Sequence, residues 1–143
     1  MGDRANVKIT FSSSPHPIYF YTHSHGSDLP EIVGAAIQRR KRWDNDAYLA
    51  RIIFSEMLKA DGDGVLNSEY GFGISSRIGD NEHPVIHVNT KNKTVCYESE
   101  DGAPISQWSF SDYTGQPFPD EESVVSFWPF RRRLIGTDEE WEL

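Results

Sequence analysis

The chain has 143 residues, a length that suits one domain and is too short for two of ordinary size. An aromatic content of 13% supplies enough apolar area to exclude a wholly disordered chain. A single cysteine, Cys96, excludes an intramolecular disulfide and a cysteine-based zinc site. No signal-peptide or membrane-spanning run is present, so we expect a cytoplasmic protein without a membrane partner.

The net charge of −8 is unevenly distributed along the chain. Residues 1–97 carry eleven acidic and eleven basic side chains, whereas residues 98–143 carry eleven acidic and three basic ones. The acidic last third disfavours a nucleic-acid partner and could be drawn to a basic protein surface, as in nucleic-acid mimics. The alternative is that these charges only keep the protein in solution.

Two strands open the chain. Val7, Ile9 and Phe11 alternate with polar residues, which is the period of a half-buried strand. A turn-forming cluster at residues 13–17 follows, and residues 18–22 are rich in aromatic and β-branched side chains. The pattern predicts a β-hairpin.

The next segment predicts a helix that begins at Asp28. Asp28 suits the N-cap, Pro30 needs no hydrogen bond in the first turn, and Glu31 can complete a capping box. Apolar residues follow at helical spacing. We expect the helix to end near residues 39–42, where cations suit its carboxyl end.

A second helix is predicted to begin near Asp44 and Asp46. Its apolar stripe consists of Leu49, Ile52, Ile53, Met57 and Leu58, whereas Arg51, Glu56 and Lys59 fall outside the stripe. We expect the helix to end at residues 61–64, where two glycines permit a left-handed exit.

The remaining pattern is one of strands and turns. Three strands are predicted as an antiparallel meander, and two more segments could add strands, the second of which could instead be a short helix. The meander comprises residues 70–78, 85–89 and 94–98, and the additional segments are residues 105–110 and 124–130.

The predicted fold class is therefore α+β, with an antiparallel hairpin and meander sheet packed against two consecutive amphipathic helices. We expect residues 1–135 to form a single domain and residues 136–143 to form a mobile acidic tail.

A histidine pair lies in the turn before the first helix. On an extended chain His23 and His25 would point to one face and could share zinc or a similar divalent metal. Asp28, Glu31 or His87 could provide a third ligand. The alternative is that the histidines only form hydrogen bonds within the turn. A calcium loop is not predicted at residues 61–69, because its spacing of oxygen ligands and glycine is wrong.

The strongest basic cluster is Arg39, Arg40, Lys41 and Arg42, followed directly by Trp43. An exposed basic loop beside an aromatic ring could grip phosphate or stack on a base. The alternatives are a solvated helix end, internal docking on the acidic last third, or a site for an anionic small molecule such as a nucleotide. Because the whole chain is acidic, nucleic acid is disfavoured.

Several short segments form a recognisable pattern, namely Tyr21-Thr22-His23, Gly26, Leu29-Pro30, Arg42-Trp43-Asp44 and residues 48–54. Together they resemble small uncharacterised proteins of bacteriophages and prophages of actinobacteria. The resemblance implies a phage setting and no particular activity. In those proteins the turn has a histidine, two residues and a glycine, so the resemblance gives His25 no role.

We therefore expect a phage-type accessory protein that binds a host or phage protein and has no catalytic activity. One alternative is a metal-dependent hydrolase or nucleotide-sequestering protein centred on the turn at residues 22–26. Another is a virion structural or assembly component, and a homodimer is compatible with each. The candidate binding residues are Tyr21, His23, Asp28, Arg39, Arg40, Arg42 and Trp43, and the candidate metal ligands are His23 and His25.

Overall fold

The computed structural model describes residues 3–60 and 71–119. The predicted helix exit at residues 61–64, the additional segment at residues 124–130 and the acidic tail lie outside the described residues. In chain order the elements are β1 (Ala5–Phe11), β2 (Ser14–Thr22), a 3-10 turn η1 (Gly26–Asp28), α1 (Leu29–Ile37), α2 (Asp46–Ala60), β3 (Phe72–Ser75), β4 (Val85–Asn89), β5 (Thr94–Glu98) and β6 (Pro104–Ser109).

The strands form one six-stranded sheet in the order β3-β2-β1-β4-β5-β6. The α+β class is confirmed, but the wholly antiparallel sheet is wrong, because β1 and β4 pair in parallel. The predicted meander is also only partly present. The strand β3 pairs with β2 at the edge of the sheet, whereas β4, β5 and β6 are consecutive antiparallel neighbours. A parallel pair requires a long crossover, and the segment containing both helices provides it.

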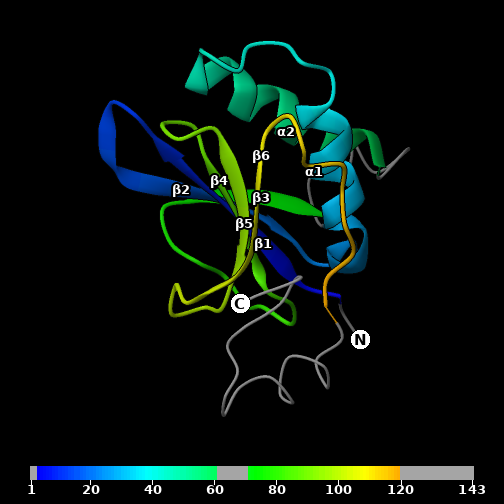
Figure 1. Cartoon of the computed structure of the whole chain (residues 1–143). Coiled ribbons are helices and arrows are strands. Elements are labelled where there is room, and N and C mark those ends of the chain that lie inside the picture. The colour runs from blue at the N-terminus through cyan, green and yellow to red at the C-terminus, as the bar shows by residue number, and fades with distance from the viewer. Residues whose placement is uncertain (1–2, 61–70, 120–143) are drawn as a thin grey trace.

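Both helices lie on one side of the sheet (Figure 1), and a shared apolar core fills the interface. Val7 and Ile9 of the central strand β1 are fully buried. The predicted bounds of β4 and β5 match the structure, whereas β2 begins at Ser14 because the hairpin turn is tighter than expected. None of the helices in the described ranges has the length and apolar content needed to cross a membrane.

The first helix begins as predicted, but it differs from its prediction in its capping, in where it ends and in its burial. The N-cap is Asp28, but its side chain makes no capping hydrogen bond, and the helix ends at Ile37. Seven of its nine residues are buried, so α1 is not an amphipathic surface helix. The helix is buried because the segment around Tyr113 and Gly115 packs on it in addition to the sheet. Gly34 packs against Gly115, and the Tyr113 hydroxyl donates to the Pro30 carbonyl at 3.0 Å.

The second helix is amphipathic as predicted, with Leu49, Ile53 and Met57 buried. Phe54 extends this contact along β2 and β3, where its ring lies 4.9 Å from the ring of Phe20. Glu56 was placed outside the apolar stripe and is instead buried, because Arg39 binds its carboxylate.

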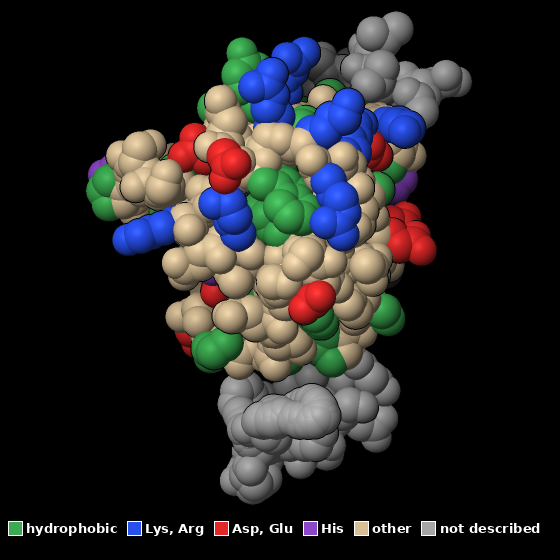
Figure 2. All heavy atoms as spheres, turned by 45° about the horizontal axis from the view of Figure 1, so that its top comes forward, with side chains coloured by type: hydrophobic (Ala, Val, Ile, Leu, Met, Phe, Trp, Pro, Cys, Tyr) green, Lys and Arg blue, Asp and Glu red, His purple; other side chains and the backbone are tan. Residues whose placement is uncertain are grey.

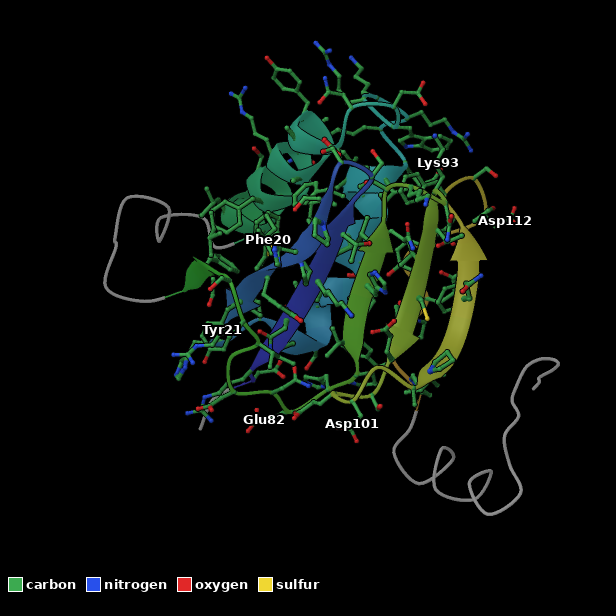
Figure 3. All side chains as sticks on the ribbon, turned by 90° about the vertical axis from the view of Figure 1, so that its left-hand side faces the viewer. Phe20, Tyr21, Glu82, Lys93, Asp101 and Asp112 are labelled. Carbon is green, nitrogen blue, oxygen red and sulfur yellow. The ribbon has the colours of Figure 1, made fainter. Side chains whose placement is uncertain are left out.

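No helix of the described residues lies on the opposite face of the sheet, which we call the helix-free face (Figure 3), and α1 is visible behind the strands. Side chains that alternate with the core positions point to this face, among them Lys8 and Thr10 of β1. The loop at residues 79–81 crosses part of this face, where its carbonyl groups accept hydrogen bonds from the buried Asn6 amide.

Candidate functional site

The histidine turn is held by backbone and side-chain hydrogen bonds. The His25 amide donates to Thr22 Oγ1 at 3.0 Å. His23 is exposed, its backbone N–H donates to the Gly71 carbonyl, and its carbonyl accepts from the Asp3 N–H. The His25 imidazole stacks on Phe72 with ring centroids 5.6 Å apart, and its Nδ1 lies 3.6 Å from Asp28 Oδ2. The turn thus connects the end of β2 to the start of α1.

Asp3 explains why this turn needs a glycine. A Cβ atom at Gly26 would lie 2.6 Å from the Asp3 carbonyl oxygen, closer than atoms can approach. Asp3 Oδ2 accepts hydrogen bonds from the amide and hydroxyl of Ser27, and Oδ1 lies 2.5 Å from His83 Nε2. Burial raises the pKa of Asp3, but these hydrogen bonds outweigh burial and leave the pKa below its ordinary value. The glycine and the neighbouring polar groups therefore have a structural explanation.

Within residues 3–60 and 71–119, no three His, Cys, Asp or Glu side chains are grouped so that they could hold a metal ion. The third ligands considered for His23 and His25 do not complete such a group in this part of the chain. A metal site at this turn stays a prediction.

The basic loop is at the other end of the molecule. The loop at residues 38–45 lies beside the β4–β5 turn at residues 90–93, and the Nζ of Lys93 is 3.1 Å from Asp44 Oδ1. We call these two segments together the basic end. Figure 2 shows Lys and Arg side chains gathered with apolar side chains on this part of the surface. The cations of the basic end are Arg39, Arg40, Lys41, Arg42, Lys91 and Lys93.

The backbone of this loop is strained. Arg40 and Arg42 have φ angles of 56° and 64°, in the left-handed region where glycine is usually found. Arg40 stands at the exit of α1, and its amide donates to the Ile37 carbonyl at 3.0 Å. A left-handed non-glycine residue typically costs about 1–3 kcal/mol. The loop holds two such residues within three positions.

Aromatic rings hold the two arginine side chains. The Arg40 guanidinium lies 5.3 Å from the centre of the Trp43 ring, and that of Arg42 lies 4.6 Å from the centre of the Tyr48 ring. These distances are those of cation–π contacts. Trp43 is itself fixed, because its indole N–H donates to the Ile37 carbonyl at 3.0 Å and its ring meets that of Phe110 edge-on.

Arg39 differs from its neighbours, because its guanidinium binds the buried carboxylate of Glu56. Among the described residues, no carboxylate forms an ion pair with Arg40, Lys41 or Arg42. These three exposed cations are therefore available to a partner, whereas Arg39 stabilises the contact between the loop and α2.

The predicted site residues thus fall into separate groups. Arg39, Arg40, Arg42 and Trp43 are together at the basic end, as their adjacency in sequence requires. His23 and Asp28 lie near the end of β2 and the start of α1, at the opposite end of the molecule, because β2 runs away from the basic end. Tyr21 lies on the helix-free face, where its ring is close to Gly79.

A second polar cluster, on the helix-free face, was missed by sequence reasoning. Lys8 and His87 are paired across β1 and β4, and Thr10 and Glu98 are their diagonal neighbours. His87 Nε2 is 3.0 Å from Thr10 Oγ1, and His87 Nδ1 is 2.7 Å from Glu98 Oε2. The polar positions of each strand were visible in sequence, but the parallel pairing that brings them together was not.

Cys96 lies opposite His87 on the neighbouring strand and is buried. Burial, followed by the nearby Glu98 carboxylate, raises the pKa of the Cys96 thiol to about 12. The thiol is therefore protonated at neutral pH and is a poor nucleophile.

Comparisons of the chain with protein-family models, curated proteins and solved structures give no match. Any assignment of function therefore rests on the geometry of these residues.

Proposed function

We propose that this protein acts by binding, and that its basic end docks on an acidic patch of a partner protein. The observation that supports the proposal is the pair of strained arginines, Arg40 and Arg42, whose guanidinium groups lie over Trp43 and Tyr48. The bacteriophage resemblance makes a host or phage protein the expected partner.

Strain at an exposed position indicates a functional constraint when the fold does not require the side chain. Glycine would satisfy the left-handed backbone at Arg40 and Arg42 with less strain. The two cation–π contacts offset part of this cost, since each contributes about 0.5–1 kcal/mol at an exposed site. They also hold the guanidinium groups in place, so less side-chain entropy is lost when a partner binds.

A protein partner suits this surface better than nucleic acid. Arg, Trp and Tyr are the side chains that most often dominate the energy of protein interfaces. The net charge of −8 would repel the phosphate backbone beyond the immediate contact. In addition, the exposed Asp44 adds a negative charge within the loop.

A second candidate, assembly from copies of this chain, is supported by acidic loops at the opposite end. Figure 3 shows Lys93 at one end of the sheet and Glu82 and Asp101 at the other. Asp80 and Glu100 lie in the same acidic loops and are exposed. The basic end of one copy could dock on this end of the next, which is a head-to-tail contact suited to a virion or assembly component.

The test places a photo-crosslinking amino acid at Lys41 and expresses the protein in a bacterial host with and without phage infection. Mass spectrometry then identifies the cross-linked product. We expect one defined protein partner, and we expect R40G/R42G to weaken the purified complex at least about fivefold, since losing interfacial arginines costs about 1–3 kcal/mol.

The control is K59Q/R77Q, which removes the same charge outside the basic end. It should leave affinity within about twofold of the wild type. Cross-links between copies, with the acidic loops as the target, would favour the assembly candidate instead. Cross-links mainly to nucleic acid, or equal affinity of R40G/R42G and wild type, would overturn the docking proposal.

A further inference from the structure

The polar cluster on the helix-free face has the arrangement of a nucleophile, a base and an orienting carboxylate. Its three members come from three adjacent strands, with Thr10 on β1, His87 on β4 and Glu98 on β5. The two hydrogen bonds, at 3.0 Å and 2.7 Å, use both nitrogens of the imidazole. Strands hold side chains more firmly than loops do, so this geometry is fixed by the sheet.

For a neutral imidazole, the two hydrogen-bond partners of His87 select the tautomer. An ionised carboxylate only accepts hydrogen bonds, so the proton of the neutral His87 imidazole is on Nδ1, facing Glu98. The unprotonated Nε2 then accepts from the hydroxyl of Thr10. This is the tautomer in which a histidine can remove a proton from a hydroxyl group.

We propose that Thr10, His87 and Glu98 form a catalytic relay that transfers an acyl group from an activated ester to Thr10. This activity goes beyond the binding function proposed above and does not depend on it. Thr10 is the nucleophile, His87 the general base, and Glu98 positions the imidazole.

The reaction balances as an ester hydrolysis. Thr10 Oγ1 forms a bond to the acyl carbon while its proton moves to His87 Nε2. The ester C–O bond breaks, and the leaving oxygen takes the proton from His87. A water molecule then attacks the acyl-threonine, gives its proton to His87 and releases the acid, after which His87 returns the proton to Thr10.

The surroundings of the relay support this assignment. The side chains of His87 and Glu98 are 15% and 10% exposed, so the relay is shielded but reachable from the helix-free face. The Nζ of Lys8 lies 3.6 Å from the other carboxylate oxygen, Oε1, and completes the positioning of Glu98. The neighbouring Cys96 does not compete as nucleophile, because its thiol stays protonated at neutral pH.

The test incubates the folded full-length protein with p-nitrophenyl acetate. Peptide fragmentation by mass spectrometry locates the acetyl group, and p-nitrophenolate release gives the rate. We expect acetylation of Thr10 in the wild type, none at that position in T10V, and a rate at least about 100-fold lower in H87Q. E98Q should slow the reaction while leaving the acylated residue unchanged.

T94V is the matched control, because Thr94 lies on the same face and no described histidine is hydrogen-bonded to its hydroxyl. It should react like the wild type. Acetylation of lysines alone, or a wild-type rate in T10V, would overturn the relay. If a variant fails to fold, the position of the acetyl group in the wild-type protein still decides the question.

Discussion

The Nζ of Lys93 lies 3.1 Å from the Asp44 carboxylate and joins the β4–β5 turn to the loop between the helices. The Asp44 side chain is 93% exposed, so this ion pair contributes little to the free energy of unfolding. The contact shows that the β4–β5 turn, which carries Lys91 and Lys93, lies beside the loop at residues 38–45. The basic end is therefore built from two segments that are about fifty residues apart in sequence.

Replacing Arg40 by glycine or by alanine separates backbone strain from side-chain contact. Both variants lose the contact with Trp43, but only glycine relieves the left-handed φ of 56°. We expect R40G to be more stable than R40A by about 1 kcal/mol, measured as the free energy of unfolding in urea. Equal stabilities would show that the position carries no strain.

The contact between Arg39 and Glu56 should be measurable as a coupling energy. The Glu56 side chain is 10% exposed and that of Arg39 is 40% exposed, so the pair is partly screened by solvent. A double-mutant cycle with R39A and E56A should give a coupling of about 1 kcal/mol. A coupling near zero would mean that the helix end and α2 are held together by apolar packing alone.

The spacing of apolar residues, every second residue in strands and every three to four residues in the second helix, was sufficient to predict most strands and that helix. The bounds of β4 and β5 match because the turn between them interrupts the alternation clearly. The parallel pairing of β1 with β4 could not be predicted, since a period of two residues says which face a side chain occupies and nothing about its neighbouring strand.

In the candidate sites, too, local features could be predicted from sequence and contacts between distant segments could not. The run of cations at residues 39–42 is local in sequence, so its clustering could be predicted, although the left-handed backbone could not. The contact of Thr10 with His87 spans 77 residues and depends on the sheet order. The burial of α1 was unexpected because the covering segment, around Tyr113 and Gly115, has no regular pattern.

Replacing Gly34 by alanine tests how closely the segment around Gly115 packs on α1. The new Cβ would lie 2.7 Å from the Gly115 amide nitrogen and 2.8 Å from its Cα, so the backbones would have to separate. Overpacking of this kind costs about 1–3 kcal/mol, whereas alanine gains up to about 1 kcal/mol in helix propensity. We expect a net loss of about 1–2 kcal/mol in urea denaturation.

The matched control for Gly34 is Gly73→Ala. Gly73 lies in β3, and nothing is within 4 Å of the position its Cβ would occupy. This variant should be neutral or slightly stabilising. If G34A behaves like G73A, the segment around Gly115 does not pack closely on the helix.

The buried tyrosine pair should make the protein sensitive to alkaline pH. The hydroxyl groups of Tyr97 and Tyr113 are 2.8 Å apart, and both side chains are buried. Burial is the largest cause that raises the pKa of each phenol above its ordinary value, and for Tyr97 the neighbouring Tyr113 adds to the effect. The folded protein therefore holds these protons more tightly than the unfolded chain does.

The sign of the pH dependence follows from this difference. Stability contributed by Tyr97 and Tyr113 is fully present below the ordinary tyrosine pKa of about 10 and falls as pH rises above it, because the unfolded chain then releases the protons. We expect the free energy of unfolding of wild type to fall more steeply above pH 10 than that of Y97F/Y113F. Phenolate absorbance of the folded state should be equal in the two proteins, since the buried pair ionises only on unfolding. A larger absorbance in folded wild type would show that water reaches the pair.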